Sequence, residues 1–129
     1  FTIATGSAAA EDDAAASHGT FVSGIIAATK NSTGVHGVAY NATILPIKIF
    51  DSASVSASVA QTAAAVTYAI GQSADVWNGS YGYDGAPPIN AIEQELDAYA
   101  TAMDAGMIMV FSAGNSSFSD PDLPAGMPY

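Results

Sequence analysis

The chain has 129 residues, with twelve acidic side chains against two lysines and no arginine, and its formal net charge is −10. Phosphate backbones and anionic membrane surfaces would repel such a chain, so we expect neither nucleic-acid binding nor membrane contact by this segment. Half of the residues are apolar and 11% are charged, which suits a folded domain with a real core. The absence of cysteine excludes disulfides, thiolate metal sites and a cysteine nucleophile within these residues.

The first half of the chain predicts two strands with a helix between them. Phe1–Ala4 indicates a short strand, and small apolar residues predict a short buried helix over Gly19–Thr29. A turn cluster follows at Asn31–Gly34. The run Ile44–Phe50 fits a strand buried on both faces, although Pro46 limits its hydrogen bonding.

The second half of the chain alternates between helical and strand patterns. Apolar residues recur at helical spacing over Val55–Ile70 and again over Ile89–Met103, with Gly106 as a C-cap of the later helix. Short strands are predicted at Asp75–Asn78 and Met107–Phe111. This order predicts an α/β fold, an incomplete doubly wound parallel sheet with helices on both faces.

Polar segments that contain glycine follow two of the predicted strands. In open parallel sheets the working residues gather at the carboxyl ends of the strands. Asn78–Gly82 and Ser112–Asn115 fall at such ends, and Asp51 follows the strand before them. We therefore expect the active or binding site at this edge of the sheet.

His18 opens the segment His-Gly-Thr-Phe-Val-Ser-Gly at the first turn of the predicted helix. An imidazole held rigidly there can relay a proton near neutral pH. Taken alone, the residue is more simply interpreted as a capping or core histidine without chemistry. The other histidine, His36, is interpreted as a solvated loop residue.

Four segments in order resemble the motifs of the subtilisin-like serine protease family. The segment at His18 resembles the family's His-Gly-Thr-x-Val-x-Gly, the segment at Asp75 its Asp-Val-x-Asn-x-Ser-x-Gly, and the segment at Phe111 its Ala-Ala-Gly-Asn. The segment at Asn31 resembles the family's turn and its Gly-Val-Ala-Pro-x-Ala segment, with Tyr40 in place of the usual proline. These segments are His18–Gly24, Asn31–Ala42, Asp75–Gly82 and Phe111–Asn115.

The resemblance implies a peptidase that hydrolyses polypeptide substrates through a Ser-His-Asp triad. His18 would act as general base and then general acid, and the Asn115 amide would donate to the oxyanion of the tetrahedral intermediate. The backbone of Ser80–Gly82 would pair with extended substrate, and the backbone of Ser112–Gly114 would line the primary specificity pocket. The implied substrate-binding residues are Ser80, Tyr81, Gly82, Ser112, Ala113 and Gly114.

The triad is incomplete in these residues. No Asp-Ser/Thr-Gly motif precedes His18, and neither Gly-Thr-Ser nor Gly-x-Ser-x-Gly follows it. We therefore interpret residues 1–129 as a partial subtilisin-like peptidase domain that lacks the upstream Asp and downstream Ser segments. Its partner would be the remainder of the protease domain, and the fragment alone should be inactive. A degenerate homologue, acting as a non-catalytic surface or interaction domain, is the alternative.

The remaining expectations concern ligands and location. We predict no cofactor and no metal, since a structural calcium near Asn31 would need ligands from elsewhere. A dinucleotide-binding module is disfavoured because no strand is followed by Gly-x-Gly-x-x-Gly. Asn115 also begins an Asn-Ser-Ser sequon, and a glycan there would be incompatible with an oxyanion role. The tail Ser117–Tyr129 resembles that of autotransporter-type bacterial subtilases, which implies a secreted or cell-surface protein.

Overall fold

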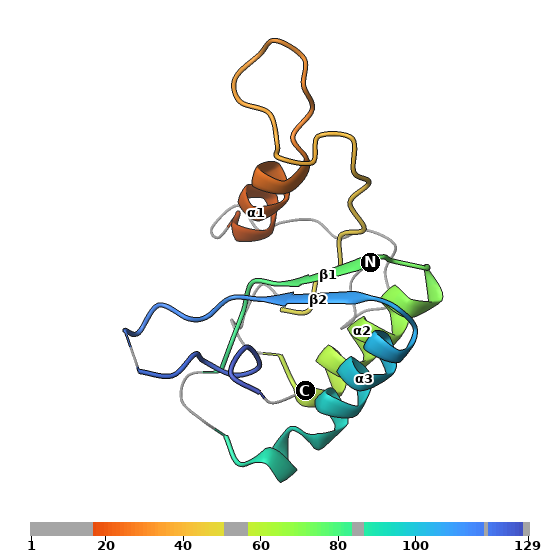
Figure 1. Cartoon of the computed structure of the whole chain (residues 1–129), viewed down its shortest axis with the longest axis vertical. Coiled ribbons are helices and arrows are strands. Elements are labelled where there is room, and N and C mark those ends of the chain that lie inside the picture. The colour runs from red at the N-terminus through yellow and green to blue at the C-terminus, as the bar shows by residue number, and fades with distance from the viewer. Residues whose placement is uncertain (1–16, 51–56, 84–86, 118, 128–129) are drawn as a thin grey trace. The chain divides into compact units, whose positions relative to one another are not determined.

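The computed structural model describes residues 17–50, 57–83, 87–117 and 119–127 (Figure 1). The chain forms two compact units, Phe1–Ser56 and Ala57–Tyr129. The strand expected at Phe1–Ala4 and the strand-end residue Asp51 lie outside the described residues.

The first unit contains helix α1, His18–Ala27, where a helix was predicted. The prediction that this helix is buried is wrong, because none of its residues is buried and Phe21 and Ile25 are 68% and 54% exposed. The described part of this unit holds no second helix for α1 to pack against. Small apolar residues therefore indicated the helix correctly but not its environment.

The chain turns back along the end of α1 after the predicted turn cluster. The turn is confirmed: Gly34 has a φ of 65°, and the Thr33 amide donates to Asn31 Oδ1 at 3.1 Å. Gly37 then donates from its amide to the Ala28 carbonyl at 2.8 Å. A Cβ on Gly37 would lie 2.4 Å from the Ala27 nitrogen, so glycine is required for this close approach.

The run Ile44–Phe50 is not the predicted strand buried on both faces. A single residue, Lys48, makes a β-bridge, while Ile44 and Leu45 are exposed. Ile49 is buried. Pro46 has no amide hydrogen to donate, which explains why a regular ladder does not run through this segment.

The second unit is built on a two-stranded parallel sheet of β1, Val76–Gly79, and β2, Ile108–Phe111. Val76 pairs with Ile108, and Gly79 pairs with Phe111. Both strands were predicted to within one residue, and their parallel pairing confirms the α/β class. Helices α2, Val59–Gly71, and α3, Glu93–Asp104, run side by side along the sheet (Figure 1).

Helix α2 begins four residues later than its apolar spacing predicts. The Ser58 side chain accepts a hydrogen bond from the Gln61 amide at 3.2 Å, and the Ser58 amide donates to Gln61 Oε1 at 2.8 Å. This reciprocal capping box satisfies two amide groups that the helix itself leaves unpaired. It therefore defines Val59 as the first helical residue.

The helix predicted over Ile89–Met103 is divided in two. A 3₁₀ turn, η1, spans Ile89–Ala91, and α3 starts only after Ile92, whose φ of −122° is not helical. Pro88 precedes the turn with an extended backbone. The predicted C-cap is confirmed: Gly106 has a φ of 90°, and its amide donates to the Met103 carbonyl at 2.8 Å.

The core of the second unit lies between the two helices and one face of the sheet. Alternate strand residues point into it, and Trp77 and Met107 are buried while Ile108 and Val110 are 63% and 47% exposed. The apolar run Met107–Phe111 is therefore exposed on one of its two faces. Helices on both faces of the sheet stay a prediction. The most deeply buried side chains are Ala65, Val66, Ile92, Glu95, Tyr99, Ala102 and Pro124.

Candidate active site

The two predicted substrate-binding segments lie next to each other at the carboxyl end of the sheet. The Ser112 amide donates to the Gly79 carbonyl at 3.1 Å, which extends the parallel pairing past the strands. The Ser112 hydroxyl then donates to the Tyr81 carbonyl at 3.2 Å. These bonds join the loop after β1 to the loop after β2, as the strand-end argument predicted.

The start of the loop after β1 is held by a side-chain bond. Asn78 Nδ2 donates to the Ser80 hydroxyl at 2.9 Å. Both side chains come from one Asn-Gly-Ser sequon, and Asn78 is exposed. The bond gives Ser80 a local role in shaping the loop, in addition to the substrate pairing expected of its backbone.

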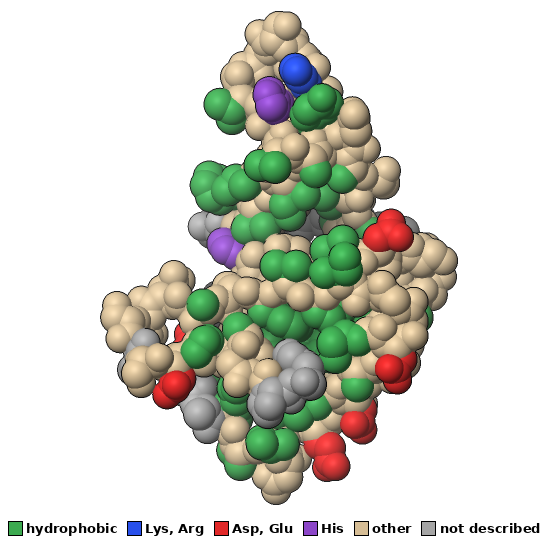
Figure 2. Space-filling view, in the orientation of Figure 1, with side chains coloured by type: hydrophobic (Ala, Val, Ile, Leu, Met, Phe, Trp, Pro, Cys, Tyr) green, Lys and Arg blue, Asp and Glu red, His purple; other side chains and the backbone are tan. Residues whose placement is uncertain are grey.

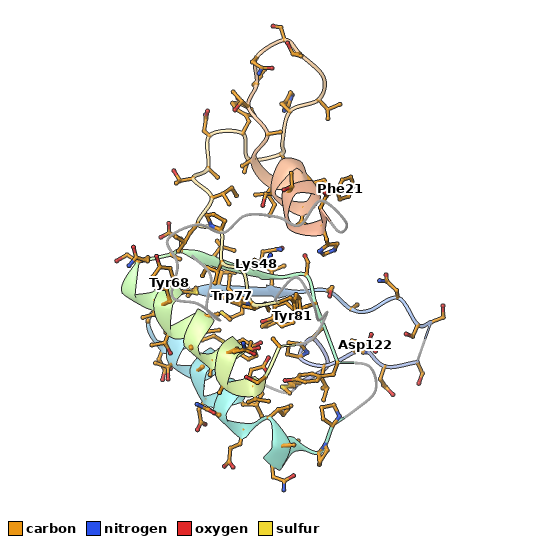
Figure 3. All side chains as sticks on the ribbon, turned by 180° about the vertical axis from the view of Figure 1, so that it is seen from behind. Phe21, Lys48, Tyr68, Trp77, Tyr81 and Asp122 are labelled. Carbon is orange, nitrogen blue, oxygen red and sulfur yellow. The ribbon has the colours of Figure 1, made fainter. Side chains whose placement is uncertain are left out.

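A third segment, which the sequence did not indicate, crosses between these two loops. The Asp122 amide donates to the Ala113 carbonyl at 3.0 Å, and the Tyr83 amide donates to the Leu123 carbonyl at 3.1 Å. Tyr81 and Asp122 both lie on the side of the sheet where the strands end (Figure 3). The two acidic residues of Asp120-Pro121-Asp122 were the only sequence signal of this segment, and they did not indicate that it lies between the two loops.

Two predicted pocket glycines make room for this third segment. Gly114 has a φ of 93°, and a Cβ there would lie 1.8 Å from Asp122 Oδ2. A Cβ on Gly82 would lie 3.1 Å from the Leu123 carbonyl oxygen and 3.5 Å from the Asp122 Cβ. Both glycines belong to the substrate-binding residues that the family resemblance implies. In the structure both positions face the Asp122 segment.

A partly buried cluster of three tyrosines and one glutamate connects the loop after β1 to α3. The Tyr81 and Tyr99 hydroxyl oxygens lie 2.8 Å apart. Tyr83 and Tyr99 each donate a hydrogen bond to the carboxylate of Glu95, which is 1% exposed. Tyr81 is therefore anchored to α3 and is only partly exposed.

Burial raises the pKa of Tyr99 well above the ordinary tyrosine value, and nearby Tyr81 and the hydrogen bond to Glu95 raise it further. Burial and the hydrogen bond to Glu95 also raise the pKa of the Tyr83 hydroxyl. A phenolate beside the Glu95 carboxylate would suffer like-charge repulsion in a poorly solvated site. Both hydroxyls therefore act as neutral donors at physiological pH.

Asn115 directly follows Gly114, whose φ is 93°, and is exposed. No hydrogen bond of its side-chain amide is found within the described ranges, so the amide is available to a ligand. This is compatible with the expected donor role.

His18 is the first residue of α1 and is exposed. It belongs to the first unit, whereas every other predicted site residue belongs to the second. Its assignment therefore rests on its motif and not on a described contact. His36 is exposed as expected, with its Nδ1 2.9 Å from the Gly37 carbonyl oxygen and its ring edge-on to Tyr40.

Neither a metal cluster nor a membrane-spanning helix is found in the described part of the chain. No group of three or more His, Cys, Asp or Glu side chains is placed to hold a metal ion among these residues. That no calcium binds near Asn31 stays a prediction. None of the described helices combines the length and apolar character needed to cross a membrane.

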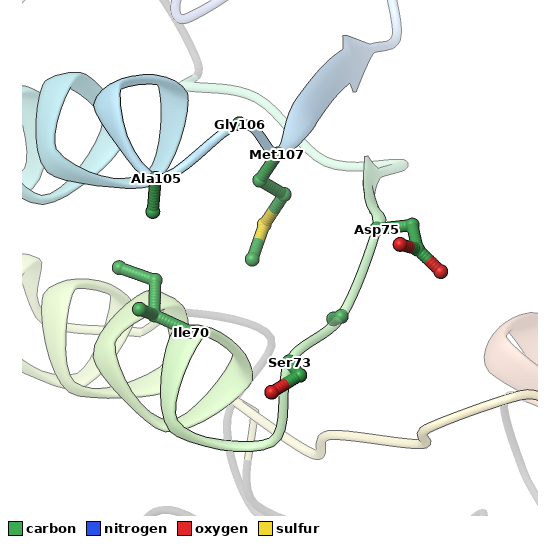
Figure 4. A pocket seen from close by; sticks show the side chains of 7 residues that line it. Ile70, Ser73, Asp75, Ala105, Gly106 and Met107 are labelled. Atoms are coloured by element: carbon green, nitrogen blue, oxygen red, sulfur yellow. The ribbon is translucent and has the colours of Figure 1, made fainter.

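A separate hollow of about 250 Å³ opens at the other end of the sheet (Figure 4). Its lining includes Ile70 and Ser73 at the end of α2, together with Asp75 and Met107, which directly precede the two strands. Asp75 is its one ionisable side chain. The hollow thus lacks the paired acid and base that hydrolytic chemistry needs.

Comparison with known proteins places the chain in a family. Residues 4–128 match the Subtilase family, peptidase S8. The chain is 39% identical over 118 residues to fervidolysin of Fervidobacterium pennivorans, covering 87% of this chain and 16% of that protein. It is 37% identical over 112 residues to subtilisin DY of Bacillus licheniformis, covering 86% of this chain and 38% of that protein.

A solved structure of the prenylagaramide maturation protease PagA has the same fold, with a TM-score of 0.68 and 23% identity. That likeness covers 83% of this chain and 38% of PagA. Subtilisin E of Bacillus subtilis strain 168 is 35% identical over 112 residues, and the chain spans 28% of its length. The chain thus spans well under half the length of these relatives. The family match over residues 4–128, together with the ordered motifs and the parallel sheet, shows that the chain belongs to the subtilase family.

Proposed function

We propose that the chain is the part of a serine endopeptidase that carries the catalytic histidine and the side-chain donor to the oxyanion. The observation that carries this proposal is the joining of the two predicted substrate-binding segments at the carboxyl ends of β1 and β2. The family match over residues 4–128 supplies the reaction class. An extended polypeptide would add as a strand along Ser80–Gly82, with Ser112–Gly114 as the opposite pocket wall.

In this proposal His18 takes the proton of a serine hydroxyl as that oxygen attacks the scissile carbonyl. It then returns the proton to the leaving amine, and an aspartate orients the imidazole and stabilises its charged form. The motifs for that serine and aspartate do not occur in these 129 residues. We propose that the remainder of the protease domain supplies them, and that the 129 residues alone hydrolyse nothing.

The exposed Asn115 amide would donate to the oxyanion of the tetrahedral intermediate. Replacing it by alanine should lower kcat by about 10²–10³-fold, a magnitude known for the corresponding donor of subtilisin and borrowed here from that relative. The site as proposed needs no cofactor. We also propose that the protein is secreted or displayed at a bacterial surface. The resemblance of the tail Ser117–Tyr129 to autotransporter-type subtilases suggests the second location.

The test is covalent labelling of the complete polypeptide that contains this chain with a fluorophosphonate probe. The modified residue is then mapped by mass spectrometry. We expect one serine outside the 129 residues to be labelled, with labelling abolished or greatly slowed by His18→Ala. His36→Ala is the matched control, since His36 is exposed in a loop and should leave labelling unchanged.

Two results would contradict the proposal. A folded polypeptide that takes no label would indicate the non-catalytic interaction domain. His18-dependent peptidase activity from the isolated 129 residues would contradict the assignment of serine and aspartate to the remainder of the domain.

A further inference from the structure

The loop after β1 is held to α3 by two side-chain hydroxyls, one on each side of Gly82. The hydroxyl oxygen of Tyr81 lies 2.8 Å from that of Tyr99, and the Tyr83 hydroxyl donates to the Glu95 carboxylate. Two residues of the loop, two positions apart, therefore reach the same helix. The loop is thus fixed to the core through its side chains as well as through its backbone.

The direction of these hydrogen bonds follows from the number of protons. A tyrosine hydroxyl has one proton, and that of Tyr99 is donated to Glu95. The Tyr99 oxygen must therefore accept the proton of Tyr81. Donation runs from Tyr81 through Tyr99 to one carboxylate oxygen, while Tyr83 donates to the other oxygen. All three hydroxyls are thus oriented, directly or through Tyr99, by a single carboxylate.

Glu95 is buried where carboxylates are normally solvated. Figure 2 shows acidic side chains on the visible surface of the second unit, whereas Glu95 is 1% exposed. A buried carboxylate is costly unless hydrogen bonds compensate for the lost water. Hydrogen bonds to an ionised group are also shorter and stronger than those between neutral groups. The network therefore holds the Tyr81 side chain firmly against α3.

The backbone of the same loop has groups left over for substrate. The carbonyls of Gly79 and Tyr81 both accept from Ser112, at 3.1 Å from its amide and 3.2 Å from its hydroxyl. No hydrogen bond of the Ser80 or Gly82 backbone is found among the described residues. These two residues can pair with an added strand, and Tyr81 lies between them. The position of Tyr81 therefore sets the register of that pairing.

We propose that Tyr99 and Glu95 are positioning residues, which hold Ser80–Gly82 through the Tyr81 hydroxyl in the conformation that pairs with extended substrate. They lie outside every segment that carries the family resemblance. They act on how a long substrate binds and not on the proton transfers assigned to His18. This inference rests on the proposed function for the location of the substrate strand, and it goes further by giving two residues of α3 a role in substrate binding.

Substrate length separates positioning from general stability. A peptide with four residues before the scissile bond would lie along Ser80–Gly82, whereas a peptide with one residue there would not reach this segment. A loosened loop should therefore weaken binding of the long peptide alone. A general loss of stability would instead lower the fraction of folded protein and weaken both peptides equally.

The test uses the complete polypeptide that contains this chain and two peptides in which a ketomethylene group replaces the scissile amide, so that neither is cleaved. One has three alanines and a phenylalanine before this group, and the other has the phenylalanine alone. Titration calorimetry gives their Kd values. Tyr81→Phe and Tyr99→Phe should each raise the Kd of the long peptide about five- to tenfold and change that of the short peptide less than about twofold. The double variant should bind the long peptide no more weakly than the weaker single variant, because both changes remove the same bond.

Tyr40→Phe is the matched control. It removes a tyrosine hydroxyl from the first unit, where the Tyr40 ring contacts His36, and both Kd values should stay unchanged. Circular dichroism checks that each variant is folded. Tyr81→Phe keeps the bond between Tyr99 and Glu95, so it tests the inference even where Tyr99→Phe is unstable.

Three results would overturn the inference. The first is wild-type protein that binds the long peptide no more tightly than the short one. The second is an unchanged affinity of Tyr81→Phe for the long peptide, and the third is equal weakening of both peptides.

Fluorogenic amide peptides of the same two lengths then test the link to catalysis. Tyr81→Phe should raise KM for the long substrate and leave kcat for the short substrate unchanged. A polypeptide that shows the Tyr81-dependent binding but cleaves neither substrate would retain the inference and contradict the proposed function. Cleavage of both substrates with equal losses in Tyr81→Phe would do the reverse, so the two failures are distinguishable.

Discussion

The hydroxyl oxygen of Tyr81 lies 2.8 Å from that of Tyr99, although the two residues are 18 positions apart in the sequence. Tyr81 belongs to the loop after β1, and Tyr99 lies on the buried side of α3. Tyr99 also donates to the buried carboxylate of Glu95. The wall that we assign to substrate is therefore supported by a polar network inside the core.

Replacing Tyr99 by phenylalanine should destabilise the second unit by about 2–3 kcal/mol. The change leaves the buried Glu95 carboxylate short of one donor and removes the partner of Tyr81, while the ring volume is kept. Urea unfolding followed by circular dichroism would measure the loss. Thr101→Ala, at an exposed position of the same helix, is the control and should change stability by less than about 0.5 kcal/mol. A similar small loss for Tyr99→Phe would show that the network contributes little.

The same network predicts a loss of stability at alkaline pH. The pKa of Tyr99 is raised in the folded state, mainly by burial, so its proton is held more tightly there than in the unfolded chain. The stabilising contribution is complete below the ordinary tyrosine value of about 10 and is lost as pH rises above it, by about 1.4 kcal/mol per pH unit.

Urea midpoints measured from pH 8 to pH 11.5 would test this dependence. Tyr99→Phe should flatten the alkaline part of the profile, while the less buried Tyr83 accounts for a remaining slope in the same direction. An identical slope in the wild-type protein and in Tyr99→Phe would contradict the assignment to Tyr99.

The capping box at the start of α2 predicts a graded series of variants. Ser58→Ala should destabilise the second unit by about 1 kcal/mol, since the Gln61 amide loses its acceptor. Ser58→Asp should retain most of the stability, because a carboxylate accepts the same bond and favours a helix N-terminus. Thermal unfolding of the three proteins would be compared. A Ser58→Asp variant as unstable as Ser58→Ala would indicate that the hydrogen bond is not the cause.

Gly114 should be the least tolerant glycine at the site. Gly114→Ala forces a side chain into a backbone with a φ of 93° and against Asp122, which should cost about 2–4 kcal/mol. Gly71→Ala is the comparison, because its Cβ would meet nothing within 4 Å at the end of α2. It should be neutral or stabilising by up to about 1 kcal/mol. Adding Asp122→Ala to Gly114→Ala should recover only the part of the loss that comes from the contact.

The sequence predicted the strands and the site edge well because these depend on local pattern. Short segments of strand pattern indicated β1 and β2, and the strand-end rule correctly brought Ser80–Gly82 next to Ser112–Gly114. Burial was predicted less well, because an apolar run does not reveal which of its faces is covered. The exposed Ile108 and the exposed α1 illustrate that limit.

Glu95 and Asp122 could not be located from sequence for a different reason. A glutamate between apolar positions of a helix normally faces water. Glu95 is buried because hydroxyls of Tyr83 and Tyr99 satisfy its carboxylate, and the Tyr83 contact joins residues 12 positions apart. Asp122 depends on backbone bonds to two separate loops. Such contacts become visible only when the chain is folded.

Trp77 is the single tryptophan of the chain and sits buried in β1, with its indole nitrogen lacking a hydrogen-bond partner within the described structure. An added Cβ on Gly79 would lie 3.1 Å from that nitrogen and 2.6 Å from the Phe111 ring of β2. The indole is thus packed where the two strands meet and is largely shielded from water. The fluorescence emission of Trp77 should consequently report whether β1 and β2 are paired, with no added dye.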